Sequence, residues 1–419
     1  MLPLDSEHVF DPAQDADFFA SLPSHPGVLL LEMKAANAQP YLARTADILR
    51  AAERLLRPPE AGSKRLNLRE VAARIRYRAT ASKFEQTLTL YGQARTNFPR
   101  RYRELLSLRP PALLKVNLRN EYPRCYVTRR IRADEGFYFG PFFSRRAADA
   151  FAEGFLDLFK TRRCQIKIRR DPSFPGCIYS EMKMCLAPCF AGCTKEEYAS
   201  EVSRVLETLD TGGAALTERL AAEREAAGEA LDFERAAALH KRLEKAAAAL
   251  RGMPELARRI ESLDAVILQR ATEDKTIIVF PLHAGILAEP IFLRFGELSM
   301  EPRPMESILR NQLEAQTGLG SSHDSSPSAA EEQTEDAADH AMQSDPAPNE
   351  DRARYGLRTA PPELAEHLSL VARWFYSNPR QGEILFREGE WPYRRILREC
   401  SRLLAPPAPP SPAPPSAHS

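Results

Sequence analysis

The sequence carries Met184-Cys185-Leu186-Ala187-Pro188-Cys189, which closes a run of four cysteines that also includes Cys164 and Cys177. The spacing is C-x12-C-x7-C-x3-C. Four thiolates are soft ligands that suit Zn²⁺ or an iron–sulfur cluster, and the spacing alone does not separate the two. Ordinary buried thiols are the alternative, because free cysteine is among the most buried residue types. We assign residues 161–194 to a four-cysteine metal module.

A pair of helices is predicted after this module, over residues 195–252, where Ala, Glu, Arg and Leu dominate and the pattern breaks near Gly228. Asp232 is expected to cap the second helix, leaving Leu231 and Phe233 at the turn as apolar anchors for a partner. A plain coiled-coil brace is the alternative. The residues expected to form the apolar seam are Leu216, Leu220, Leu231, Phe233, Ala237 and Leu243.

A small α/β domain is predicted before the module, at residues 17–105. A turn and an apolar run at 26–32 indicate a buried strand, and helical patterns follow at 47–56 and around 68–75. Residues 106–160 are expected to extend this domain with strands in 121–128 and 138–139. An amphipathic helix over 145–160 completes the extension.

The C-terminal part is expected to be a partial α/β segment at 260–315, with strands at 264–269 and 276–282. Residues 316–361 have low complexity and are predicted to be a disordered linker. Residues 362–404 form a predicted helical segment, with helices at 363–376 and 393–404, and 405–419 is a Pro-rich tail. The fold class is therefore predicted to be α+β and multidomain.

Composition excludes several protein classes. The chain has 419 residues, a formal net charge of +1 and seven cysteines, five of which lie between Cys164 and Cys193. This crowding favours metal ligation over a secreted disulfide framework. No stretch approaches the roughly 20 apolar residues that cross a bilayer, and Met1-Leu2-Pro3-Leu4-Asp5 is no signal peptide. We expect a cytoplasmic protein with no membrane partner.

Several segments together resemble the UvrC family, which belongs to the UvrABC excinuclease of bacterial nucleotide excision repair. They are Phe159 to Cys164, Pro175 to Tyr179, Met184 to Cys189 and Ala230 to Ala237. The resemblance implies a [4Fe-4S] cluster at Cys164, Cys177, Cys185 and Cys189. It leaves out Cys193, and core thiols are expected at Cys125 and Cys400.

The helical pair resembles the UVR motif of that family. This resemblance implies that a UvrB-type helicase subunit is bound through Leu231, Phe233, Glu234 and Ala237. The family usually continues with Arg-Asp, where this chain has His240-Lys241.

The N-terminal domain resembles the GIY-YIG nuclease domain of the same family, through Leu22 to Val28, Tyr41 to Arg44 and Thr80 to Pro99. Phosphodiester hydrolysis needs a carboxylate for a divalent metal, a cation for the developing charge and hydroxyls to organise water. The family's first tyrosine falls on Leu29, its arginine on Ala51 and its metal-binding glutamate on Leu90. Tyr41 and Arg44 are vestiges of the site.

We therefore expect the nuclease chemistry to be lost. The alternative is rescue by Arg50 or Arg54 and by Glu85, and Mg²⁺ would be needed only in that case. The resemblance ends before the RNase H-like endonuclease core and the helix-hairpin-helix motifs, and no aspartate cluster for two metals follows.

A basic surface is predicted to contact DNA, expected to be damaged duplex, with Tyr77, Tyr102 and Tyr122 stacking on unpaired bases. A solvated arginine-rich surface is the alternative. The arginines assigned to DNA are Arg50, Arg54, Arg100, Arg101, Arg129 and Arg130.

Three functions compete. The preferred one is a UvrC-like component of excision repair that binds DNA and a UvrB-type partner without incising. The second is an active short UvrC-like endonuclease that makes a single incision near lesions. The third is an adaptor that acts through the hairpin and does not bind DNA.

Overall fold

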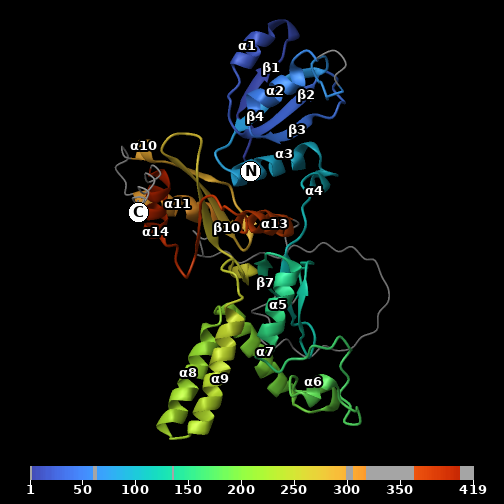
Figure 1. Cartoon of the computed structure of the whole chain (residues 1–419), viewed down its shortest axis with the longest axis vertical. Coiled ribbons are helices and arrows are strands. Elements are labelled where there is room, and N and C mark those ends of the chain that lie inside the picture. Colours follow the sequence, from blue (N-terminus) through green and yellow to red (C-terminus); the bar gives the residue numbers. More distant parts are fainter. Residues whose placement is uncertain (1, 60–63, 135, 299–304, 318–362, 406–419) are drawn as a thin grey trace, which may run out of the picture.

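The computed structural model describes residues 2–59, 64–134, 136–298, 305–317 and 363–405 (Figure 1). Helices accompany three small antiparallel sheets, so the predicted α+β class is confirmed. Most of the predicted linker at 316–361 and nearly all of the tail at 405–419 lie outside the described residues. Among the described helices, none is long and apolar enough to cross a membrane.

The N-terminal domain is a four-stranded sheet with helices on both faces. The strand order is β1-β4-β2-β3, formed by Ser6–Val9, Ala72–Ala79, Gly27–Met33 and Tyr41–Thr45. Short helix α1 (Asp15–Ala20) and α2 (Ile48–Leu56) contribute to the core on one face, and α3 (Lys83–Asn97) lies on the other. The strand predicted at 26–32 and the helix predicted at 47–56 are confirmed.

The helix predicted around 68–75 is wrong, because this stretch leads into strand β4. Ile75 and Tyr77 point into the core on the α2 side. Arg74, between the strand's apolar positions, pairs instead with Glu7 and Glu32. Alternation with a period of two is the pattern of a strand with one apolar face.

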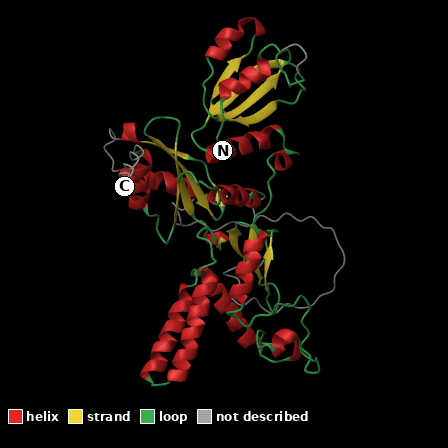
Figure 2. Ribbon diagram, in the orientation of Figure 1, coloured by secondary structure: helices red, strands yellow, loops and turns green. Residues whose placement is uncertain are grey.

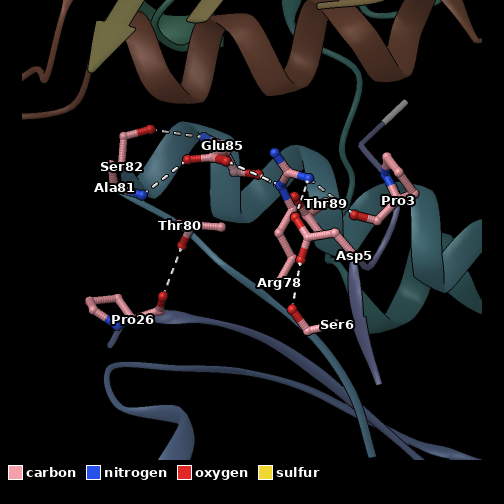
Figure 3. A network of polar contacts seen from close by, with 10 residues as sticks. All are labelled: Pro3, Asp5, Ser6, Pro26, Arg78, Thr80, Ala81, Ser82, Glu85 and Thr89. Atoms are coloured by element: carbon pink, nitrogen blue, oxygen red, sulfur yellow. Dashed lines mark hydrogen bonds and ion pairs between the residues drawn. The ribbon is translucent and has the colours of Figure 1, made fainter. Parts of the chain in front are cut away.

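A buried ion pair fixes the corner between β4 and α3 (Figure 3). The Glu85 side chain is 1% exposed and accepts from Arg78 Nε at 3.2 Å and from Ala81 N at 3.0 Å. Ser82 caps the helix by accepting from the Glu85 N–H. Burial raises the pKa of Glu85, and the Ala81 N–H and Arg78 only partly offset this rise. Glu85 is therefore committed to the backbone and to Arg78.

The middle domain is built on a second sheet, with strand order β6-β5-β7-β8. The strands are Cys125–Thr128, Ala112–Asn117, Gly136–Phe142 and Arg258–Arg259. Short helix α4 (Tyr102–Leu105) precedes it, while α5 (Arg145–Leu156) and α7 (Lys195–Asp210) contribute to its core. The predicted strands and amphipathic helix are present with shifted ends.

A long hairpin of α8 (Ala214–Glu229) and α9 (Phe233–Leu250) extends from the middle domain (Figure 2). Leu216, Leu220, Ala227, Leu239 and Ala246 form its buried seam and belong to the same core cluster as the middle domain. Three members of the predicted seam, Leu231, Phe233 and Ala237, are exposed instead. Leu231 and Phe233 lie at the turn, and Ala237 lies on the exposed face of α9, whereas its neighbour Ala236 packs against the cluster.

The third sheet has the order β11-β10-β9-β13, with β12 also paired to β10. The strands are Ile286–Leu287, Thr276–His283, Ala265–Arg270, Glu383–Phe386 and, for β12, Ile291–Arg294. Helix α10 (Phe295–Leu298) follows β12. Helices α11 (Met305–Thr317) and α14 (Tyr393–Leu404) supply the core on one face, and α13 (Leu364–Phe375) packs on the other.

Residues 362–404, predicted as a helical segment, also contain strand β13, which pairs antiparallel with β9 and which the sequence did not predict. The two predicted helices correspond to α13 and α14. This segment thus completes the sheet that begins at β9. A four-residue strand gives too short an apolar run to be recognised from the sequence alone.

Helix α3 joins the N-terminal domain to this third sheet. Phe84 and Leu88 share a core cluster with Leu368 of α13, and the Phe84 ring lies 5.2 Å from the Trp374 ring. Arg373 donates to the carbonyls of Leu106 and Ser107. Because α3 is covered on both sides, the N-terminal domain is packed firmly onto the C-terminal part of the chain.

Candidate functional site

The four positions that the sequence predicts as counterparts of a nuclease site are divided between the two faces of the N-terminal sheet. Leu29, Tyr41 and Ala51 lie in or against the apolar cluster on the α2 side. Leu90, on α3, packs against the opposite cluster with Val28. The structure therefore brings together three of the four counterpart positions and places the fourth in a separate apolar contact.

Polar groups near these positions are cationic or already engaged. Arg44, Arg50 and Arg54 are exposed, and Arg50 lies 3.7 Å from Asp47, whose carboxylate caps α2. Glu85 is held by Arg78 and a backbone N–H, as described above. Within the described parts of the chain, no group of three His, Cys, Asp or Glu side chains is placed to hold a metal ion.

The four-cysteine module is a set of loops around α6 (Ile178–Glu181) and the 3-10 turn Pro188–Phe190. Cys164, Cys177 and Cys185 are partly exposed, whereas Cys189 is buried. The Cys177 N–H donates to the Ser180 hydroxyl at the start of α6, and Cys185 Sγ accepts from Ala187 N at 3.3 Å. All seven cysteines are free thiols.

Arg162 and Tyr198 anchor the module to the middle domain. Arg162 Nε donates to the Tyr122 carbonyl and Nη1 to the Ile166 carbonyl, both at 2.8 Å. Tyr198 Oη accepts from Arg162 N at 2.9 Å and donates to the Pro123 carbonyl. The sequence offered no pattern for Tyr198, and Arg162 was visible only as one basic residue before Cys164.

The backbone of the module is unusually constrained. Lys183, Ala187 and Ala191 have φ values of 56°, 57° and 62°, in the left-handed region that non-glycine residues rarely adopt. Such conformations persist only where the surroundings determine them strongly. They occur on both sides of Cys185 and Cys189 and thereby set the direction of these two thiols.

The four thiols lie near enough for their charges to interact. Burial raises the pKa of the Cys185 thiol to about 11, and the three other thiols of the set add to this rise. Burial also raises the pKa of Cys189. Four sulfur donors from one module fit a soft metal or an iron–sulfur cluster in their chemistry. In the described module, however, no three of these thiols lie close enough together to coordinate one metal ion.

The hairpin ends in an exposed apolar tip. Asp232 Oδ1 accepts from Arg235 N at 3.0 Å, so the predicted cap of α9 is confirmed. Leu231 is 72% exposed and Phe233 is 70% exposed, and Leu231 has a φ of 58°. Glu234 and Ala237 are exposed on the same first turns of α9. All four predicted partner-binding residues are thus accessible.

The predicted basic surface is accessible, but its aromatic residues are not. Tyr77, Tyr102 and Tyr122 are buried in three different core clusters. A role for these tyrosines in base stacking is therefore wrong, because each ring contacts the protein interior. The six arginines assigned to DNA are all exposed: Arg50, Arg54, Arg100, Arg101, Arg129 and Arg130.

Comparison with known proteins gives one family match. Residues 112–208 match the middle domain of the UvrC/Cho excinucleases. This range begins with β5 and ends within α7, so it contains all four cysteines together with Arg162 and Tyr198. No solved structure shows a significant match to this chain.

Curated relatives extend the similarity beyond the middle domain. The UvrABC system protein C of Nitratidesulfovibrio vulgaris is 32% identical over 190 residues, which cover 44% of this chain and 25% of the relative. The protein of the same name from Carboxydothermus hydrogenoformans is 26% identical over 280 residues, covering 66% and 46%. That of Moorella thermoacetica is 26% identical over 293 residues, covering 70% and 47%.

The chain therefore spans between a quarter and just under half the length of these relatives. Through its middle domain, and more distantly over a larger part of its length, the chain is related to the UvrC excinucleases of nucleotide excision repair.

Proposed function

We propose that this protein is a component of nucleotide excision repair that binds DNA and a UvrB-type helicase subunit and makes no incision itself. The observation that carries the proposal is the hairpin tip, where Leu231 and Phe233 are exposed directly beside a capped helix start. Large exposed apolar side chains at a rigid tip provide anchor area for a partner. The family match of the adjacent middle domain points to UvrB as the partner class.

The lack of incision is supported by the N-terminal domain. Ala51 and Leu90 supply neither a cation nor a carboxylate, and Glu85 is buried in its own ion pair. Metal binding and stabilisation of the phosphate charge each contribute several kcal/mol to catalysis, so losing both removes most of the rate. Exposed arginines remain on this domain and on the middle domain, where they favour retention on DNA.

A metal centre in the cysteine module is part of the proposal. Cys164, Cys177, Cys185 and Cys189 would hold a [4Fe-4S] cluster, with Zn²⁺ as the alternative. When bound, such a centre cross-links the loops of the module and supplies a fixed charge. Arg162 and Tyr198 hold the root of these loops in place independently of the metal.

Strand incision tests this proposal directly. A lesion-containing duplex is loaded with UvrA and UvrB from the same organism, and the purified protein is added with Mg²⁺ or Mn²⁺. We expect no cut, with the protein retained on the UvrB–DNA complex. A specific cut that is lost in Tyr41→Phe or Arg44→Ala would instead favour the active short endonuclease. Binding to UvrB with no retention of DNA at low salt would favour the adaptor.

A further inference from the structure

A groove of about 380 Å³ lies at the root of the cysteine module, between β6, α5 and the start of the module. No described residue of the α8–α9 hairpin lines the groove, and the module around α6 and the hairpin project from different sides of the middle domain (Figure 1). The side chains that carry the argument are Arg124, Tyr126, Arg145 and Arg163.

Arg124 and Tyr126 form a flat, cationic wall of the groove. The Arg124 guanidinium lies 4.6 Å from the centre of the Tyr126 ring. Both side chains are partly exposed, and in the described structure Arg124 makes no ion pair. A guanidinium stacked over an aromatic ring offers both a phosphate ligand and a flat surface on which a base can stack, the two features by which proteins bind single-stranded nucleic acids.

The other cations are only partly neutralised. Arg145 pairs with Asp149 at 3.4 Å, and Arg163 pairs with Asp157 at 2.6 Å. Arg163 Nε is nevertheless buried and has no acceptor among the described residues. Glu153 also lines the groove, so the local excess of positive charge is modest.

The positive charge continues from the groove onto the module. Residues 160–190 contain seven Lys or Arg and two Asp or Glu. Large apolar side chains are exposed among these charges at Ile166, Ile178 and Met182. A ligand that covers this surface must therefore be anionic and must present apolar faces at short intervals. An unpaired strand, with a phosphate and a base at every nucleotide, has that pattern.

We infer that this groove binds a single strand of nucleic acid, with phosphates at Arg124 and Arg145 and a base stacked on Tyr126. A duplex is excluded as the occupant of the wall, because its bases are already stacked on one another. The inference rests on the proposed function for the identity of the strand as DNA. The groove would contact unpaired DNA on the middle domain, beside the cysteines. This contact is additional to the general DNA affinity proposed above.

Binding of a fluorescein-labelled oligo-dT of about 15 nucleotides tests the groove. Measured by anisotropy at low salt on the full chain, Arg124→Ser/Tyr126→Leu should bind about tenfold more weakly and lose about one unit of the salt slope. Tyr126→Phe keeps the ring and should bind like the wild type. Arg394→Ser removes a 95% exposed arginine of α14 as the charge control and should also leave affinity unchanged.

Photocross-linking places the strand. An oligonucleotide that carries 5-iododeoxyuridine should form its adduct at Tyr126, identified by mass spectrometry of the tryptic peptides. If the double variant and the wild type bind oligo-dT with equal affinity and the adducts form elsewhere, the groove is not the binding site of the strand. Polyglutamate is also tested as a competitor of the labelled strand. If it competes as strongly as unlabelled oligo-dT, and equally well in the wild type and the Tyr126 variants, the groove binds an acidic peptide and the inference is wrong.

The outcome is distinguishable from that of the proposed function. If the double variant keeps oligo-dT affinity and the protein is still retained on the UvrB–DNA complex, the groove is wrong and the repair function stands. If the wild type binds neither oligo-dT nor the UvrB–DNA complex, both the groove and the repair function are wrong. Equal thermal unfolding of the double variant and Tyr126→Phe shows that a loss of binding does not reflect a loss of folding.

Discussion

Tyr91 donates a hydrogen bond of 2.5 Å to Oε2 of Glu366, although 275 positions separate the two residues. The Tyr102 hydroxyl donates to Oε1 at 2.8 Å, and Arg103 Nε donates to the same oxygen at 2.6 Å. The Glu366 side chain is only 7% exposed. One carboxylate of α13 therefore gathers the donors of α3 and α4 and fastens the N-terminal domain to the third sheet.

Replacing Glu366 by Ala should destabilise the protein. Two buried hydroxyls and a guanidinium lose their acceptor, which we expect to lower the free energy of unfolding by about 2 to 4 kcal/mol. Urea unfolding measures this change. Glu273→Ala, which removes a surface pair with Arg294, is the matched control and should cost less than about 1 kcal/mol. Equal stabilities of the two variants would show that the Glu366 contacts do not hold the domains together.

His367, next in the chain, should make stability depend on pH. Its Nδ1 accepts from Leu287 N, and its Nε2 is buried without a partner among the described residues. Burial lowers the pKa of His367 to about 4 from an ordinary 6.5. Between these two pKa values the unfolded chain binds a proton at His367 and the folded chain does not. The free energy of unfolding therefore falls as the pH drops from about 6.5 toward 4.

The full decrease in the free energy of unfolding that is attributable to His367 is about 3 kcal/mol. His367→Gln should remove this part of the pH dependence, seen as the difference between the variant and the wild type in urea unfolding at several pH values. His283→Gln, which replaces a partly exposed histidine of the same sheet, is the control for the removal of an imidazole, and its unfolding is measured over the same pH range. If the free energy of unfolding of the His367 variant depends on pH as in the wild type, another group is responsible for the pH dependence.

Metal content should depend on four cysteines and not on their neighbours. Cys185→Ser should abolish bound metal after anaerobic purification and lower the melting temperature, because the cross-link between loops is lost. Cys193→Ser and Cys125→Ser alter buried thiols outside the set and should keep the metal. Broad visible absorbance with iron and sulfide identifies an iron–sulfur cluster, and a colourless protein with zinc identifies the alternative. Equal metal loss in the Cys193 variant would contradict the assigned ligand set.

Phe233 should matter for partner binding and not for folding. Because its side chain is largely exposed, Phe233→Asp should leave the melting temperature unchanged and weaken binding to a UvrB-type helicase at least about tenfold. Calorimetric titration of the helicase measures the affinity. Lys241→Ala, also exposed on α9, is the control for a change on the same helix. A wild-type affinity of the Phe233 variant would leave the hairpin as a structural brace.

The sequence predicted elements where the local pattern agreed with the final packing. Strand β2 follows a turn signal, and α14 has the predicted bounds, because each has one clear apolar face or run. The cap at Asp232 was predictable for the same reason, since it depends on neighbours within three residues. Such features are decided locally and are visible in the residue order.

The failures involve contacts between residues far apart in the chain. Tyr77, Tyr102 and Tyr122 looked like surface aromatics among arginines, yet each is buried and contacts a side chain of another element. Glu85 was a candidate catalytic carboxylate until Arg78 proved to hold it. Neither Tyr198 nor the pairing of β13 with β9 has a local signature. Tertiary packing decides these positions, and residue spacing does not encode it.

The pairing of β13 with β9 also has a consequence for synthesis. β9 is complete at Arg270, but its partner ends at Phe386, so a ribosome needs roughly ten seconds to deliver it. During that interval β9 presents an open edge, and the apolar side chains that α13 will cover are exposed to other nascent chains. Translation that stalls before Phe386 would therefore yield an aggregation-prone product in place of a shorter folded protein.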